Sequence, residues 1–353
     1  MPYPLNLRKV CKTGPQFAWV EPMNVKRTTV MKQLGLGLNL LTKRTGKREF
    51  LDEMNEVVPW AALVAVVEPH SPRAKTGRPP FAIETMLRIH YLQQWFNLSD
   101  PAMEEALHDV LLYREFAGLD DGASRPPDES TILRFRHLLE EHDLAVDMLR
   151  VVNDILQAKG LLLRAGTEVD ATLIAAPSST KNASGERDPE MRQTKKGNNW
   201  YFGMKAHIGV DADSGLVHTV AGTAANMSDL NMAGALLHGQ EKNVFADAGY
   251  HQGAHKRDEA QGPTWHVAMR RGRRKQLNTF LEHDFLIEQI EQIEQLKASG
   301  RAKVEHPFRV IKRQFGFAKV RYRGLAKNTA QLVTLFALSH LWMARRKLLV
   351  AQG

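Results

Sequence analysis

Two aspartates stand at places in the sequence where a carboxylate is costly to bury. Asp170 lies inside the apolar run Val-Asp-Ala-Thr-Leu-Ile, and Asp247 ends the run Val-Phe-Ala-Asp. A buried carboxylate needs a hydrogen bond, an opposite charge or a metal ion. Each aspartate alone is most simply a structural carboxylate that hydrogen-bonds a neighbouring loop. If the two runs are neighbouring strands, however, the carboxylates repel each other, and a shared divalent cation would relieve that repulsion.

A third acidic candidate, Glu305, stands in a segment rich in positive charge. Arg301 precedes Glu305 by four residues, and Lys312 follows it by seven. At these spacings the three side chains share one face of a helix. Pro307 has no N–H and is tolerated best in the first turn of a helix. An alternative is therefore a helix that begins near Val304, with Glu305 in its first turn and Arg301 in the segment before it. A row of surface salt bridges is the competing interpretation of such a charge ladder.

A sheet would bring the candidate acids together, and the second half of the chain has the sequence pattern of a sheet. Strand-like runs alternate with helical patterns, and the turn at 211–215 joins two of the runs as a hairpin. The strand-like runs cover residues 169–174, 200–210, 216–222, 244–247 and 265–269, and the helical patterns cover 228–238 and 282–297. This order predicts an α/β domain with a mixed sheet covered by helices.

The second of these strands carries further polar candidates. Lys205 and His207 are two residues apart and therefore point to the same face of the strand. We expect both to line the groove that holds the acids, and Trp200 lies at the start of the same strand. Ordinary positions on a sheet face are the alternative.

Helical patterns fill the first half of the chain after an arm, residues 1–45, that we expect to be poorly structured. The patterns cover residues 47–66, 83–96, 101–116, 129–141 and 144–159. In the fourth, Arg134 and Arg136 are interleaved with apolar residues, as in a helix that reads DNA bases. The connector at 118–128 is too long for a compact helix-turn-helix, so packing in the core is the competing interpretation.

Composition narrows the class of protein. The chain has 353 residues, with 48 lysines and arginines against 39 acidic residues, and one cysteine. Residues 270–327 hold 15 basic and 6 acidic residues, a net charge of +9 that equals that of the whole chain. This clustering favours a polyanionic partner such as nucleic acid, with a solvated helical face as the alternative. Cys11 alone excludes an internal disulfide and a cysteine-rich zinc site, which fits a reducing cytosol.

Neither export nor membrane insertion is expected. The first thirty residues contain no clean apolar stretch of the kind that a secretory signal needs. The most apolar late stretch, residues 330–344, is shorter than the roughly 20 residues that cross a bilayer. We therefore expect a cytoplasmic protein with no membrane partner.

Three motifs stand out in the second half of the chain: Lys195-Lys-Gly-Asn-Asn-Trp-Tyr-Phe-Gly-Met-Lys-Ala-His207, Ala246-Asp-Ala-Gly-Tyr250 and Glu305–Gly324. In these motifs the chain closely resembles the DDE transposases of bacterial insertion sequences, in the group named after the fifth insertion sequence described. The resemblance extends to Glu84–His90 and Asn97–Asp100. It implies a ribonuclease-H-like mixed sheet with helices on both faces, preceded by an all-helical N-terminal domain.

The resemblance also implies roles for the three acids. The family takes its first aspartate from the first strand, here Asp170, and its second from the fourth strand, here Asp247. Its glutamate comes from a later helix, here Glu305. Two Mg²⁺ ions, for which Mn²⁺ can substitute, would be bound by these acids, with Asp170 bridging both ions.

Further site residues follow from the same resemblance. Arg301 and Lys312 match the family signature around the glutamate and are expected to act in catalysis, whereas Ala298 stands where the signature has tyrosine. DNA contacts are expected from basic and aromatic residues: Lys195, Lys196, Trp200, Lys205, His207, Arg309, Lys312, Arg313, Arg321, Arg323, Arg134 and Arg136.

The implied activity is cleavage of double-stranded DNA at an element's terminal inverted repeats and strand transfer to target DNA, by a homodimer associated with the bacterial nucleoid. The implied parts are a helical DNA-binding domain (46–160), a catalytic domain (161–340) and a C-terminal tail (341–353). A regulator that binds the ends without cutting would share the basic segment, but it would have no need of the acid triad. A nuclease without strand transfer is a further alternative on the same fold.

Overall fold

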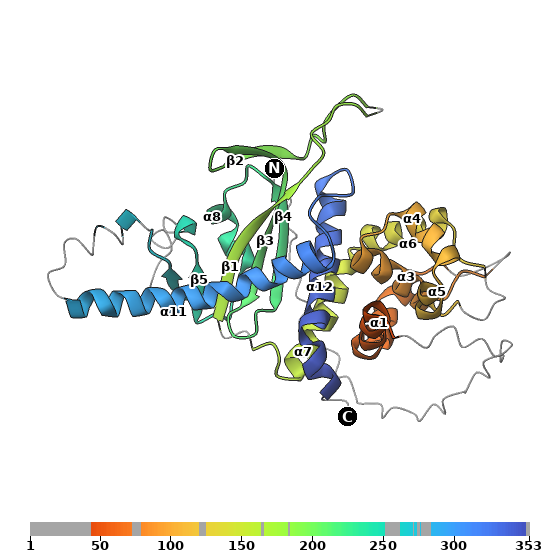
Figure 1. Ribbon diagram of the computed structural model, residues 1–353, viewed down its shortest axis with the longest axis horizontal. Helices are drawn as coiled ribbons and strands as arrows, with labels where there is room; N and C mark the ends of the chain where they lie inside the picture. The colour runs from red at the N-terminus through yellow and green to blue at the C-terminus, as the bar shows by residue number, and fades with distance from the viewer. Residues whose placement is uncertain are drawn as a thin grey trace.

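The computed structural model describes residues 44–72, 79–119, 125–163, 166–182, 184–250, 262–270, 272–273, 276 and 284–350. The arm expected over residues 1–45 falls almost entirely outside this set. Among the described residues, helices make up the first and last parts of the chain, and a mixed sheet lies between them (Figure 1).

The N-terminal helices form where capping residues and buried apolar faces coincide. They are α1 (Gly46–Val57), α2 (Trp60–Val67), η1 (Glu68–His70), α3 (Ile83–Phe96), α4 (Asp100–Asp109), α5 (Leu111–Ala117), α6 (Glu129–Glu141) and α7 (Leu144–Ala158). Asp128 caps α6 by accepting a hydrogen bond from Thr131 N at 2.8 Å. Asn97 ends α3 in the left-handed conformation. The helix expected at 101–116 is divided in two, because Val110 has an extended backbone.

The sheet has β1 (Gly166–Ala175) at its centre. β1 pairs antiparallel with β3 (Asn199–Asp211) on one side and parallel with β5 (Asn243–Ala246) on the other. β3 also pairs with β4 (Val217–Ala224) and with β2 (Arg192–Lys196), and β6 (Thr264–Val267) lies parallel to β5. The predicted mixed sheet is confirmed, with β2 as an addition. Its sequence, Arg-Gln-Thr-Lys-Lys, has no apolar alternation that could have indicated a strand.

Alternation along β1 separates the two faces of the sheet. Ile174 points into the main hydrophobic core, to which α11 (Asp284–Arg309) and α12 (Leu325–Val350) contribute. Val169 points the other way, into a smaller core with η2 (Ala233–Leu236), which follows the short helix α8 (Asp229–Met232). Helices therefore cover both faces, and Figure 1 shows α11 crossing in front of the sheet.

Helix α12 joins the two halves of the protein. It stands between the sheet and the N-terminal helices and packs against α1, α7 and β4 (Figure 1). Leu341, Ala344 and Leu348 are buried, so the helix continues to Val350 through most of the stretch that was expected to be a tail. The N-terminal helices and the sheet thus share one hydrophobic core. No helix among the described residues is long and apolar enough to cross a membrane.

A buried polar junction fixes α12 to its neighbours. His340 is fully buried; its Nε2 accepts a hydrogen bond from Val217 N at 2.8 Å, and its Nδ1 lies 2.9 Å from Asn153 Oδ1. Burial lowers the pKa of His340 to about 3, so the ring is neutral. A proton on Nε2 would meet the Val217 N–H and break the junction between α12, α7 and β4.

We predict that this junction makes the folded protein less stable as the pH is lowered. The pKa of His340 is lower in the folded than in the unfolded protein, so the stabilisation is complete above about pH 6.5 and is lost as the pH falls toward 3. The free energy of unfolding should drop by as much as roughly 1.4 kcal/mol per pH unit from this residue. Urea unfolding at pH 7, 6 and 5 measures it. His340→Gln should have a shallower slope; an unchanged slope would exclude His340 as the cause.

Candidate active site

Asp170 lies near the middle of β1, on the face that α11 covers. It pairs with Ile208 of β3, whose side chain belongs to the main core, and paired residues point to the same face. The carboxylate is half-buried, and its Oδ1 accepts a hydrogen bond from Ala171 N at 2.8 Å. Asp170 therefore lies next to apolar side chains of the main core and is partly accessible to solvent.

Asp247 follows β5 directly, at the same level of the sheet. Val169 and Ala246 are partners in the parallel pairing of β1 with β5, so each aspartate is the next residue of its chain segment. Neighbouring strands lie about 4.8 Å apart. The strands of the two acids are thus sheet neighbours, which is the condition for mutual repulsion and for a shared cation.

The turn after β5 positions Asp247. Its Oδ1 accepts a hydrogen bond from Gly249 N at 2.7 Å, and a Cβ on residue 249 would lie only 2.8 Å from that oxygen. Tyr250 closes the turn: burial raises the pKa of its hydroxyl, and nearby carboxylates, Asp170 and Asp247 among them, raise it further. Sequence reasoning gave Tyr250 no role, although it ends the motif Ala-Asp-Ala-Gly-Tyr.

Helix α11 carries Glu305 past the strands of the two aspartates. The helix contacts both β1 and β5. Glu294 accepts a hydrogen bond from Met269 N at 2.9 Å, just beyond β6, and Lys303 Nζ donates to Ala212 O at 2.8 Å in the turn between β3 and β4. These bonds fix the helix across the sheet, while the Glu305 side chain is exposed.

Lys312 ties the end of this helical segment to the strand of Asp170. Its Nζ donates to Thr172 Oγ1 at 2.6 Å and to Leu173 O at 3.1 Å. Burial, and then the positive charge of Lys196, lowers the pKa of Lys312, while Asp170 raises it. Lys312 therefore lies near both Asp170 and Lys196. Thr172 is a contact that sequence reasoning missed, although alternation along β1 places it on the face of Asp170.

The helix around the third acid does not begin near Val304. α11 runs through Pro307 and is followed directly by the π-helix η4 (Val310–Gln314), which contains Lys312. Val304, Pro307 and Phe308 are buried. Packing of this apolar face sustains the helix although Pro307 removes one backbone hydrogen bond.

Several predicted DNA contacts are exposed. Lys195 lies opposite Trp200 on the β2–β3 hairpin, and Trp200 is 66% exposed. Arg309 and Arg313 are exposed close to Lys312 in the sequence. Exposed too are Lys196, Arg134 and Arg323, the last of which donates to Ser184 Oγ at 2.8 Å.

The structure contradicts the placement of Lys205 and His207 in the groove with the acids. Both lie on the opposite face of β3 from Ile208, the partner of Asp170. Lys205 Nζ donates to Asp229 Oδ1 at 2.9 Å, and the fully buried His207 has its Nε2 2.8 Å from Thr223 Oγ1. Burial lowers the pKa of His207 to about 4, which keeps the ring neutral. The competing interpretation, ordinary positions on a sheet face, is the correct one.

Arg136 is also a structural residue. Its guanidinium is buried, pairs with Asp100 at 3.0 Å and Glu140 at 2.7 Å, and lies over the Tyr322 ring at 4.1 Å. A cation neutralised by two carboxylates inside the core is not free to contact a base or a phosphate. The prediction of a DNA contact at Arg136 is therefore wrong, and core packing explains this residue.

Arg321 is committed to a contact between the two halves of the protein. Its Nη2 donates to both the backbone and side-chain oxygens of Asn97 at the end of α3. The DNA contact expected of Arg321 stays a prediction. Arg301 and Ala298 lie within α11, but their side chains are outside the described residues, so the role of Arg301 stays a prediction.

Comparison with known families agrees with this arrangement. A model described as a transposase DDE domain matches residues 163–342, just over half of the chain, and a model described as a transposase domain (DUF772) matches residues 39–138. The first range contains the whole sheet and the three acids, and the second contains α1 to α5 and most of α6. A DDE domain implies a ribonuclease-H-like fold. No solved structure matches the chain.

Two carboxylates on adjacent strands should make stability depend on divalent cations. We predict that Mg²⁺ or Mn²⁺ raises the melting temperature of the wild type, because the cation offsets the repulsion between Asp170 and Asp247. Asp170→Asn and Asp247→Asn should melt at least as high as the wild type without metal and gain less from it. Thermal unfolding with and without the cation measures the effect. Asp154→Asn, on an exposed position of α7, is the control. Equal gains in all four proteins would contradict a cation site at this pair.

Proposed function

Because this chain belongs to the transposases with a DDE domain, we propose that it moves an insertion sequence. It binds the terminal inverted repeats of the element, cuts the DNA at its ends and joins the freed 3′ ends to target DNA. The observation that carries this proposal is the position of Asp170 and Asp247, which directly follow the paired residues Val169 and Ala246 on neighbouring parallel strands that both contact the helix bearing Glu305.

The donor set fits a hard divalent cation. The candidate ligands are carboxylate oxygens, which Mg²⁺ and Mn²⁺ prefer. In the proposed site Asp170, Asp247 and Glu305 would together hold two such ions. Bound ions would activate the attacking oxygen and stabilise the leaving oxygen of a phosphodiester.

Lys312 supplies positive charge beside the acids. Its ammonium is fixed by Thr172 Oγ1 and Leu173 O, so it is already oriented when DNA arrives. We assign it to a phosphate next to the scissile bond, where its charge offsets the charge that accumulates in the transition state. Arg309 and Arg313, exposed on the same helical segment, would contact phosphates further along the strand.

The β2–β3 hairpin provides a second DNA surface near the acids. Its exposed Lys195 and Lys196 can neutralise phosphates, and Trp200 offers a flat apolar face for stacking on a base. The position of Lys196 near Lys312 connects this surface to the site. Sequence choice falls to the N-terminal helices, where Arg134 is exposed.

The assembly proposed on DNA is a homodimer in the bacterial cytoplasm. An insertion sequence has two ends that must be held together, and one copy of the chain at each end meets that need.

We predict that the acid triad is required for chemistry but not for DNA binding. On a duplex that carries the element's end, with Mg²⁺ or Mn²⁺, the wild type should cut and join strands. Asp170→Asn, Asp247→Asn and Glu305→Gln should each lower both rates by roughly 10³-fold or more. Gel electrophoresis of labelled DNA measures both products.

Glu288→Gln is the matched control for Glu305→Gln, because Glu288 is an exposed glutamate earlier in the same helix. Variants that keep full activity would show that the acids are misassigned. A wild type that binds ends without cutting them would favour a regulator, and one that cuts without joining would favour a nuclease.

We also predict that the hairpin contributes to affinity in two separable ways. Lys195→Ala combined with Lys196→Ala should weaken DNA binding and reduce the slope of log affinity against log salt by about one to two. The reason is that a protein with fewer phosphate contacts releases fewer counterions from the DNA when it binds. Trp200→Ala should weaken binding with the slope unchanged. Fluorescence anisotropy at several salt concentrations distinguishes them. Lys159→Ala, an exposed lysine after α7, is the control, and an equal effect of this variant would refute a specific role of the hairpin.

A further inference from the structure

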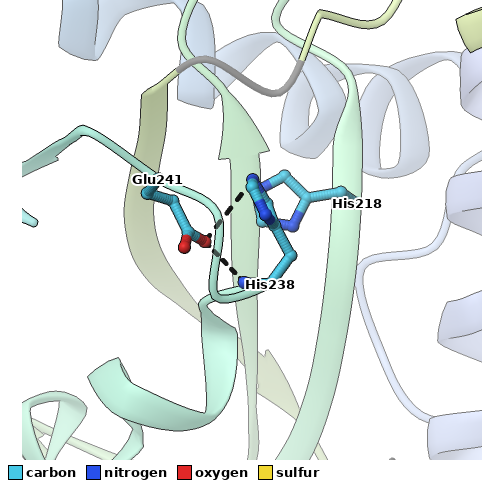
Figure 2. A group of neighbouring side chains, drawn as sticks. All are labelled: His218, His238 and Glu241. Carbon is cyan, nitrogen blue, oxygen red and sulfur yellow. Dashed lines mark hydrogen bonds and ion pairs between the residues drawn. The ribbon is translucent and has the colours of Figure 1, made fainter. Parts of the chain in front are cut away.

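Three potential metal ligands converge on the face of the sheet opposite Asp170. They are His218 of β4, His238 after η2, and Glu241 just before β5 (Figure 2). One ligand atom from each residue lies within 4.8 Å of the other two. Gly209 of β3 makes room for this cluster, since a Cβ there would lie 2.7 Å from the His218 ring.

One spacing within the cluster is close to that of two ligands of a tetrahedral ion. His238 Nε2 lies 3.5 Å from Glu241 Oε1, which is longer than a good N–H···O hydrogen bond. With metal–ligand bonds of about 2.0 to 2.1 Å, two ligands of tetrahedral Zn²⁺ are roughly 3.3 to 3.4 Å apart. The imidazoles of His218 and His238 stand 4.8 Å apart at 81°, so both can direct a nitrogen to one point without stacking.

The surrounding hydrogen bonds orient two of the three ligands. Glu241 is buried, and its carboxylate accepts hydrogen bonds from His238 N at 2.5 Å and Gly239 N at 2.7 Å. His218 Nδ1 lies 2.9 Å from Thr219 Oγ1, and this contact helps to orient the ring, whose other nitrogen, Nε2, is the candidate ligand atom. On His238, metal binding through Nε2 requires a proton on Nδ1, so the long 3.3 Å contact from Gln240 N to that atom would be lost.

Thr167 completes the group. Its Oγ1 lies 3.0 Å from His218 Nε2 and 3.3 Å from Glu241 Oε1. The hydroxyl can occupy the fourth position of a tetrahedral ion or hydrogen-bond a water molecule there.

We propose that His218, His238 and Glu241 bind one Zn²⁺ ion. Two imidazoles and one carboxylate are a zinc ligand set, whereas Mg²⁺ prefers oxygen ligands alone. The site is therefore chemically distinct from the three acids proposed for catalysis. Its ligands come from β4 and from the loop that leads into β5, and Thr167 lies at the start of β1. The ion ties these segments together upstream of Asp170 and Asp247 and has a structural role.

The test uses the full-length chain without a histidine tag, stripped of metal with EDTA and then freed of the chelator. The wild type should take up one Zn²⁺ per chain in competition with a chromogenic chelator, in the presence of millimolar Mg²⁺. Zn²⁺ should also raise its melting temperature. Glu241→Gln, which keeps a similar shape and an acceptor oxygen, and His238→Ala should bind at least 100-fold more weakly. His137→Ala, an exposed histidine in α6, should bind as the wild type does.

Further measurements separate this proposal from the catalytic one and from failed folding. Asp170→Asn should bind zinc normally; loss of the ion in that variant would assign it to the catalytic carboxylates instead. If the cluster variants do not fold, Co²⁺ in the wild type decides, because a tetrahedral site with nitrogen ligands gives strong visible absorption and an octahedral oxygen site does not. The proposal would be overturned by weak absorption, by fewer than one Zn²⁺ per chain, or by equal binding to Glu241→Gln. In each case the three residues would be a hydrogen-bonded cluster without a metal ion.

Discussion

The parallel pairing of β1 with β5 is the constraint on which the site depends. It places Val169 beside Ala246 and so brings Asp170 and Asp247 to the same level of the sheet. Two carboxylates at the same level of neighbouring strands repel each other unless a cation lies between them. The rest of the site supplies positive charge: Lys312 reaches β1 from the segment after α11, and Lys196 approaches from the hairpin.

The two faces of the sheet that holds these aspartates are covered differently. One face shares a core with α11, α12 and the N-terminal helices, and this common core links the sheet to the helices proposed to choose the DNA sequence. The other face has its own smaller core and the cluster of His218, His238 and Glu241. Alternation along β1 thus places Asp170 on the face with the common core and Val169 on the face with the smaller core.

Local patterns were enough to predict the described strands other than β2 and the helical first half, because alternation, turn residues and apolar periodicity are local properties. What could not be predicted depends on partners far away in the sequence. Lys205 and His207 do share a face of β3. The pairing of Asp170 with Ile208 shows that this face is the one opposite Asp170. Arg136 has the pattern of a DNA contact, and only the approach of Asp100, 36 residues away, makes it structural. Helix α11 continues through Pro307 because of tertiary packing that no local rule contains.

The central claim is that divalent cations bind where β1, β5 and the segment from Glu305 to Lys312 meet. Iron-mediated cleavage of the protein tests it most directly: Fe²⁺ replaces Mg²⁺, and with ascorbate and peroxide it cuts the backbone close to the bound ion. The account predicts cuts near residues 170, 247 and 305–312 that excess Mg²⁺ suppresses. Cuts spread evenly over the chain, or confined to other segments, would contradict it.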